Sequence, residues 1–176
     1  MKKVILIVGL FAMAVTSCKK ETSKEETTVD GRDILTGNYT GSVTTEYLDS
    51  DSGGTTIFEN TDDNYTCKVV KSGTNNLAIS IFNSSNELVL TTNTTEIAKE
   101  PNHESYFIKI SNPIKTINGD FIGFHPLGIT PYHGLFNFQE SKTFSLNIKS
   151  VNSNSLEYAG ENYNNVNIEA KFSFKK

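Results

Sequence analysis

The side chains best suited to metal binding or acid–base chemistry in this sequence are three histidines, His103, His125 and His133. His125 and His133 share one segment with Asp120, but a zinc site needs three or four ligands that converge. His103 precedes Glu104 without the second histidine that a metallopeptidase motif requires. Nucleophile-elbow and phosphate-binding glycine motifs are also absent from the sequence. The sequence therefore predicts no catalytic residue, no metal and no cofactor, and hence a protein that is not an enzyme.

An acidic, glycine-containing stretch, DSDSGGTTIFEN, comes close to a calcium-binding loop. Asp49 and Asp51 occupy its first and third positions, where such loops carry carboxylates. The last position, which normally holds a bidentate glutamate, is Asn60, and Glu59 stands one place early. An acidic turn between two strands explains the same residues. Calcium binding by Asp49 and Asp51 therefore stays open at the level of the sequence.

Residues 123–134, GFHPLGITPYHG, form the most unusual stretch of the chain. The prolines exclude it from a central strand, and the large apolar side chains distinguish it from an ordinary polar loop. Its composition fits a lid or rim over a ligand cavity, a partner-binding patch, or a connection packed over the open end of a barrel. The lid interpretation predicts ligand-binding residues here, together with two tyrosines of an earlier strand: Phe124, His125, Leu127, Tyr132, His133, Tyr39 and Tyr47.

The elements that would position these side chains are β-strands. Apolar and polar residues alternate along most of the chain, most regularly over residues 166–174, and such alternation gives a strand one buried and one wet face. It puts Tyr39 and Tyr47 on the same face of the first strand. Polar breaks such as the Asn-Gly pair at 118–119 favour hairpins. Residues 36–176 are therefore expected to form a single all-β domain of about eight to ten antiparallel strands, either a meander barrel or a β-sandwich.

The first residues look like an export signal. Two lysines precede an apolar run from Val4 to Val15, which is shorter than the ~20 residues of a membrane-spanning helix and fits the apolar core of a signal peptide. The run ends in Val15-Thr16-Ser17-Cys18. This sequence resembles the lipobox of bacterial lipoproteins, an aliphatic residue and two small residues before an invariant cysteine. The resemblance implies cleavage before Cys18, with acyl chains on the sulfur and on the new amino group of that residue.

Acylation at Cys18 would make the protein a lipid-anchored component of the bacterial cell envelope, because two or more acyl chains hold a protein stably to a bilayer. Residues 1–17 are then the signal peptide. Residues 18–35 are a charged, threonine-rich tether with a coil reach of roughly 20–25 Å. Because Lys19 rather than aspartate follows the cysteine, the resemblance favours the outer membrane and leaves the face of that membrane open.

The start of the expected domain resembles lipocalin-like barrels. In those proteins a Gly-x-Trp opens the first strand, and its aromatic residue closes one end of the barrel. Here Gly37-Asn38-Tyr39 stands at that place with Gly41 following, and the chain has no tryptophan. The resemblance implies an antiparallel meander barrel that holds a small apolar or amphipathic ligand. The alternative function is a non-enzymatic structural or interaction module of an outer-membrane assembly, with an envelope protein as its partner.

The overall charge of the chain is acidic, with 20 Asp and Glu against 16 Lys and Arg and a net charge of -4 at pH 7. Nucleic-acid binding needs clustered positive charge, so no nucleic-acid partner is expected. The same balance argues against electrostatic docking to anionic lipid beyond the anchor itself.

The second of the two cysteines, Cys67, would have no intramolecular partner once Cys18 is acylated. Exported proteins usually use cysteines in pairs. No histidine stands close to Cys67 in the sequence. We therefore predict that Cys67 is a small buried apolar residue rather than a catalytic thiol.

Overall fold

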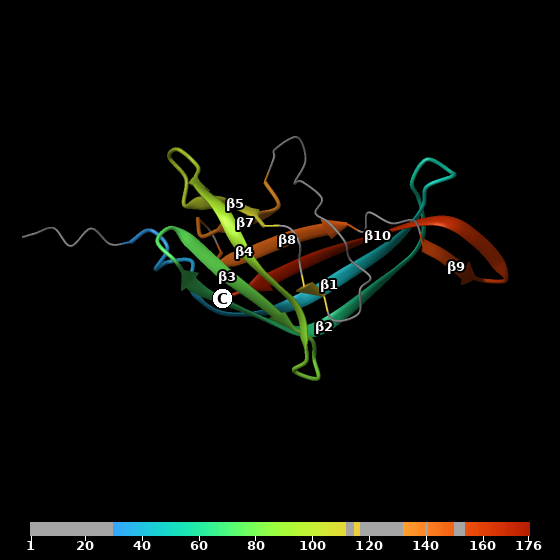
Figure 1. Ribbon diagram of the computed structural model, residues 1–176, viewed down its shortest axis with the longest axis horizontal. Helices are drawn as coiled ribbons and strands as arrows, with labels where there is room; N and C mark the ends of the chain where they lie inside the picture. Colours follow the sequence, from blue (N-terminus) through green and yellow to red (C-terminus); the bar gives the residue numbers. More distant parts are fainter. Residues whose placement is uncertain (1–29, 112–114, 117–131, 140, 150–153) are drawn as a thin grey trace, which may run out of the picture.

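The computed structural model describes residues 30–111, 115–116, 132–139, 141–149 and 154–176. Within these residues the regular elements are β-strands, joined in one antiparallel sheet (Figure 1), so the predicted all-β class is confirmed. No helix long and apolar enough to cross a membrane occurs in this part of the chain. The strands are β1 (Gly37–Asp49), β2 (Thr55–Ser72), β3 (Asn76–Phe82), β4 (Leu88–Lys99), β5 (Ser105–Ile110), β6 (Lys115–Thr116), β7 (Gly134–Asn137), β8 (Thr143–Lys149), β9 (Asn154–Tyr158) and β10 (Glu161–Lys175).

The sheet curls until its first strand meets a strand near the end of the chain. Neighbouring strands follow the chain order from β1 to β5 and then through β7, β8 and β10, and β10 also pairs with β1. That last pairing runs from Thr40 opposite Lys175 to Asp49 opposite Val166. β6 pairs with β4, and β9 pairs with β10, alongside this ring. The sheet is therefore a closed, barrel-like meander, as predicted, and not the alternative sandwich of two stacked sheets.

Closure of the ring depends on a close approach of β1 and β10 at Gly41. A Cβ atom at this position would lie 1.9 Å from the carbonyl oxygen of Ser173 and 2.8 Å from the Cα atom of Phe174. Both are backbone atoms of β10, which cannot swing aside as the end of a flexible side chain can. Glycine lets the two backbones come this close, so the residue at this position is set by the closure of the sheet.

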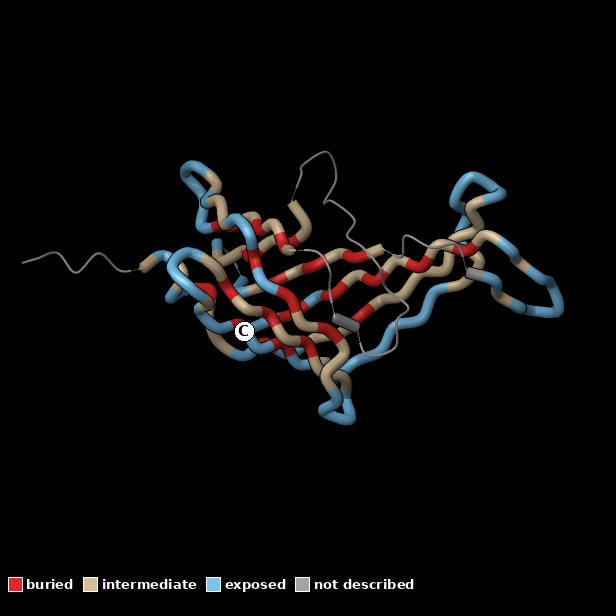
Figure 2. The backbone as a smooth tube through the Cα atoms, in the orientation of Figure 1, coloured by how far each residue is buried: buried red, intermediate tan, exposed pale blue. Residues whose placement is uncertain are grey.

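The interior of the ring is filled by the apolar members of the alternating pattern. In β10, buried residues such as Ala170 and Phe172 alternate with partly exposed ones, as the alternating colours along the tube in Figure 2 show. The largest buried side chains include Phe136 and Phe144. Their ring centroids lie 4.2 Å apart, and Phe174 lies 6.0 Å from Phe144. The core is thus a packed aromatic cluster surrounded by aliphatic side chains from the other strands.

Residues 30–36 pack against the end of the ring at which β1 begins (Figure 1). The guanidinium group of Arg32 donates to the carbonyl oxygens of Gly73 and Asn76 in the turn between β2 and β3, at 3.1 and 3.2 Å. Leu35 has no exposed surface. The folded part of the chain therefore reaches back into the stretch that the sequence indicates as tether.

Candidate functional site

Tyr39, predicted to bind a ligand, lies at the end of the ring that residues 30–36 cover. Its hydroxyl donates to the carbonyl oxygen of Leu35 at 2.6 Å, and its ring centroid lies 5.9 Å from that of Phe136 and 6.1 Å from that of Phe144. Its exposed fraction is 0%, and a side chain without accessible surface borders no space that holds a water molecule. Tyr39 therefore has the position of a core residue whose hydroxyl reaches a backbone group, and not that of a cavity wall.

Other inward-facing side chains of the ring are packed in the same way. Those without exposed surface come from β2, β3, β4, β5, β7, β8 and β10, which make up most of the circumference. They are Val69, Leu77, Ile79, Ile81, Leu90, Ile108, Phe136, Phe144, Leu146, Val166 and Ala170. No water-sized space adjoins these side chains, so this part of the interior is close-packed core. A ligand site has to be sought outside this set.

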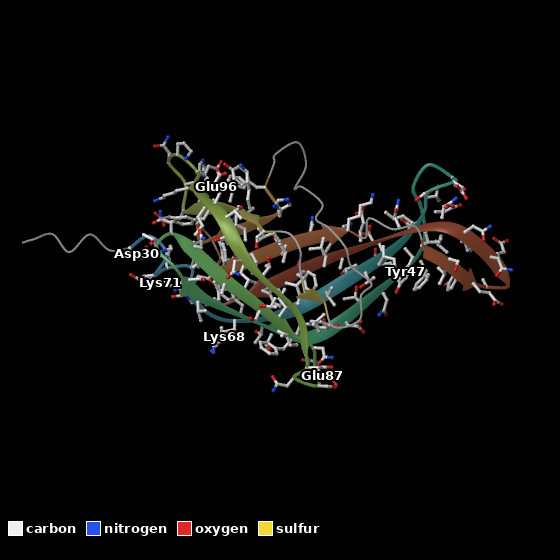
Figure 3. The ribbon with its side chains drawn as sticks, in the orientation of Figure 1. Asp30, Tyr47, Lys68, Lys71, Glu87 and Glu96 are labelled. Atoms are coloured by element: carbon white, nitrogen blue, oxygen red, sulfur yellow. The ribbon has the colours of Figure 1, made fainter. Side chains whose placement is uncertain are left out.

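Tyr47 lies at the far end of β1 from Tyr39 and belongs to a stack of three rings, which we call the aromatic stack (Figure 3 labels Tyr47). Phe58 stands opposite Tyr47 on β2, with the ring centroids 4.2 Å apart. Tyr158 of β9 stacks on Phe58 at 4.6 Å and is 43% exposed. Partly exposed aromatic rings offer a surface to apolar and amphipathic molecules.

Phe58 and Tyr158 do not stand out in the sequence. The register of the hairpin that joins β1 to β2 places Phe58 beside Tyr47, and the turn-forming letters DSDSGG give that register approximately. Tyr158 belongs to a strand that pairs with β10 rather than with β2. Its contact with Phe58 is a product of the closed sheet, and no local signal in the sequence indicates it.

Tyr132, also predicted to bind a ligand, lies on the outer face of β4 and β5. Its hydroxyl donates to the carboxylate of Glu96 at 3.0 Å, and its ring stacks on Phe107 with the centroids 5.4 Å apart. The ammonium group of Lys109 lies 5.1 Å from the ring centroid and also binds Glu96. These contacts place Tyr132 in a surface cluster that is separate from both Tyr39 and the aromatic stack.

His133 has a structural place just before β7. Its backbone N–H donates to the carbonyl oxygen of Ile108, and its own carbonyl oxygen accepts from Asn147. Its ring nitrogen Nδ1 accepts from the backbone N–H of Ile110 at 3.3 Å. Burial, with a smaller contribution from the charge of Lys109, lowers the pKa of His133. A neutral imidazole that accepts a backbone hydrogen bond fits this environment.

The remaining predicted ligand-binding residues, Phe124, His125 and Leu127, lie outside the described residues, as does Cys18. The lid interpretation of residues 123–134 therefore stays a prediction. The described members of the predicted set, Tyr39, Tyr47, Tyr132 and His133, are not gathered at one place in the fold.

Asp49 and Asp51 belong to the hairpin turn between β1 and β2. The carboxylate of Asp49 accepts from the backbone N–H of Asp51 at 3.0 Å and from the hydroxyl of Ser52 at 2.5 Å. The carboxylate of Asp51 accepts from the side-chain amide of Asn165 at 2.7 Å. Among the described residues no group of three or more His, Cys, Asp or Glu side chains is arranged to hold a metal ion. These contacts favour the acidic-turn interpretation of this stretch.

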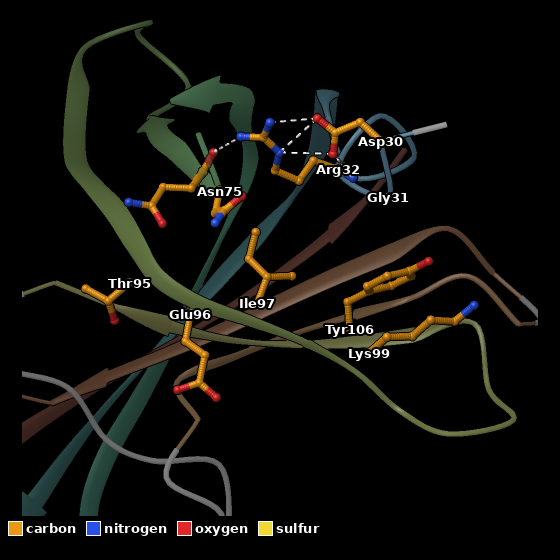
Figure 4. A pocket seen from close by; sticks show the side chains of 10 residues that line it. Asp30, Gly31, Arg32, Asn75, Thr95, Glu96, Ile97, Lys99 and Tyr106 are labelled. Carbon is orange, nitrogen blue, oxygen red and sulfur yellow. Dashed lines mark hydrogen bonds and ion pairs between the residues drawn. The ribbon is translucent and has the colours of Figure 1, made fainter. Parts of the chain in front are cut away.

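A pocket of about 460 Å³ opens where β3 and β4 separate, beyond the last pairing of Ala78 with Asn93 (Figure 4). The charged groups at its wall bind other side chains of the protein: Arg32 with Asp30, Lys99 with Glu104, and Glu96 with Lys109. Its volume lies in the range of small-molecule sites. Because those charges are paired within the protein, the pocket offers no single ionic anchor to a ligand.

Cys67 is buried with 1% of its surface exposed, as predicted. Burial raises the pKa of its thiol far above the usual range. A buried, protonated thiol packs as a small apolar side chain and is a poor nucleophile.

Comparison of the chain with protein-family models, with curated proteins and with solved structures finds no match. The function is therefore argued from the chain itself.

Proposed function

We propose that this protein is a lipid-anchored protein of the bacterial outer membrane whose barrel-like domain binds a small apolar or amphipathic molecule at the aromatic stack. The observation that carries the proposal is the difference between the two ends of the domain. The end that continues into the tether is packed with buried side chains, including Leu35 and Tyr39, whereas the opposite end presents the partly exposed rings of the stack.

The lengths of the elements support this arrangement. About a dozen residues separate Cys18 from the folded part that begins at Asp30, and as a coil they reach roughly 20 Å. β1 starts at Gly37 and reaches Tyr47 of the aromatic stack after roughly 33 Å. A ligand site at the stack would stand away from the anchor, where a molecule in the surrounding solution has access to it.

The anchor is tested by replacing Cys18. The Cys18→Ser variant is expected to lose all incorporation of labelled palmitate and to leave the membrane fraction after a high-salt wash, because the acylated atom is gone. The matched control is Cys67→Ser, which should keep both the label and the membrane fraction. Retention of palmitate by Cys18→Ser, or its loss from Cys67→Ser, would show that the lipobox interpretation is wrong. Separation of the inner and outer membranes on a density gradient then tests the proposed location.

The ligand site is tested by replacing Tyr158, the most exposed ring of the stack. Tyr158→Ala in the mature, unacylated chain is expected to bind a fluorescent fatty-acid analogue about fivefold more weakly, because one aromatic contact is worth about 1 kcal/mol. Val70→Ala is the control, since Val70 is exposed to a similar extent, 41% against 43%. Equal binding by both variants, or no binding by the parent chain, would contradict the proposed site.

A second candidate function is the non-enzymatic interaction module. The packed interior around Tyr39 favours it, because a filled ring acts through its surface. In that case the parent chain binds no fatty-acid analogue, and chemical crosslinking in intact cells should join the protein to an envelope protein. Tyr158→Ala should weaken that crosslink if the aromatic stack is the contact surface.

A further inference from the structure

The charged side chains of the domain are distributed unevenly between its two ends. Four exposed lysines lie near the end that continues into the tether, and we call them the lysine patch: Lys68, Lys142, Lys175 and Lys176. None of them forms an ion pair with a carboxylate among the described residues. The ammonium group of Lys176 donates to the carbonyl oxygens of Ile34 and Thr36, so the charges directed to the surroundings are those of Lys68, Lys142 and Lys175.

The strand pairings bring these lysines together. Lys175 of β10 lies opposite Thr40 of β1, and Lys68 of β2 lies opposite Asn38 of the same strand, so the two lysines flank β1. The backbone N–H of Lys176 donates to the carbonyl oxygen of Lys142. Loss of hydration and the neighbouring charge of Lys142 lower the pKa of Lys176. Residues far apart in the sequence thus form one positively charged surface.

The two carboxylates of residues 30–36 are already bound by cations of the protein. Asp30 accepts from Arg32 at 2.6 Å and from Lys71 at 3.1 Å, and Asp33 binds Lys71 at 2.5 Å. These contacts hold the pKa of Asp30 well below its usual range, chiefly through Arg32. Figure 3 shows Asp30, Lys71 and Lys68 toward the same end of the molecule. These two carboxylates therefore offset Arg32 and Lys71 rather than the lysine patch.

The opposite end carries the reverse charge. Four carboxylates in the β1–β2 turn and the β9–β10 hairpin bind no lysine or arginine within the described part of the chain: Asp49, Asp51, Glu157 and Glu161. The chain is acidic overall, but its unpaired positive and negative side chains lie at different ends of the domain. The positive end is the one that the tether holds near the bilayer.

We propose that the lysine patch is a docking surface for the anionic lipid headgroups of the membrane that holds Cys18, an inference that rests on the proposed anchor. A tether of roughly 20 Å keeps the patch near the surface, and clustered lysines beside a membrane bind anionic headgroups. Docking through the lysine patch turns the aromatic stack outward, because the stack lies at the opposite end of β1. The net charge of the sequence argues against such docking, but the bilayer interacts with the nearest charges because more distant ones are screened beyond about 8 Å.

The test uses the mature, unacylated chain with Cys18→Ser, so its result does not depend on acylation. Binding is measured by co-sedimentation with vesicles of phosphatidylglycerol and phosphatidylcholine in equal parts, and with vesicles of phosphatidylcholine alone. The expected result is binding to the anionic vesicles only, weakening as salt is added. The triple variant K68Q/K142Q/K175Q should bind about 100-fold more weakly, since three lysines near the surface are removed.

The matched control is K109Q/K149Q/K171Q, which changes the net charge by the same amount. Each of these lysines is paired with a glutamate, Glu96, Glu169 or Glu46, and none belongs to the lysine patch. This variant should keep the affinity of the parent chain. Equal weakening by both triple variants, or no preference for anionic vesicles, would overturn the proposal. Either result would leave the palmitate test of the anchor and the fatty-acid test of the stack unaffected.

Discussion

Replacing Phe144 by alanine is expected to lower the free energy of unfolding by about 4 kcal/mol, because removal of a fully buried phenylalanine leaves a cavity that its neighbours only partly fill. Phe144 has no exposed surface, and its ring packs against those of Phe136, Phe174 and Tyr39. A loss of this size is a large fraction of the free energy of unfolding of a typical domain. Unfolding by urea is monitored by circular dichroism rather than by tryptophan fluorescence, because the chain has no tryptophan.

Phe107→Ala provides the control for Phe144→Ala. Phe107 is only partly buried and stacks on Tyr132 at the outer face of the sheet. Its replacement should lower the free energy of unfolding by roughly half as much or less, because less apolar surface is returned to water. A Phe107→Ala variant as unstable as Phe144→Ala would mean that the aromatic cluster inside the ring is not the centre of the core.

Replacing Gly41 by alanine is expected to lower the free energy of unfolding by about 3 kcal/mol, which is large for the addition of one methyl group. The new Cβ atom would lie 1.9 Å from the carbonyl oxygen of Ser173, so β1 and β10 must separate locally. Hydrogen exchange should therefore become faster for amides in the β1–β10 ladder than for amides in the β3–β4 ladder. Mass spectrometry of peptides from the two ladders measures this difference.

Gly31→Ala is the matched control for Gly41→Ala. No atom lies within 4 Å of a Cβ built at Gly31, so the same chemical change meets open space there. Its free energy of unfolding should stay within about 0.5 kcal/mol of that of the parent chain. If both variants behave alike, the close approach of β1 and β10 does not limit the closure of the ring.

The strands of this fold could be predicted from the alternation of apolar and polar residues, whereas the closure of the sheet could not be predicted from that alternation and was implied only by the resemblance at Gly37-Asn38-Tyr39. Alternation such as that of residues 166–174 reflects a sheet with one buried face, and the structure has a strand there. The same alternation occurs in a barrel and in a sandwich, so it does not decide between them. The close approach of Gly41 to Ser173 closes the sheet into a ring. These two residues are far apart in the chain, so the local pattern of apolar and polar residues does not predict that they meet.

The candidate site could be predicted only in part. The face of Tyr39 followed from the pattern of β1, but its packing against Phe136 and Phe144 depends on β7 and β8, which periodicity does not place beside it. Tyr158 joins the aromatic stack through contacts between strands that are distant in the sequence. The lysine patch could not be predicted from composition either, because the net charge of the chain does not say where the charged side chains lie in the fold.

The pairing of β1 with β10 also has a consequence for the order of events during synthesis and export. The ring cannot close until β10 has left the ribosome, because β10 supplies one wall of the seam. Contacts between such distant segments form slowly, since the loop between them must first be ordered. The signal peptide proposed for residues 1–17 would direct the chain across the inner membrane before it folds. A ring that closes only when β10 has been made would suit such a passage.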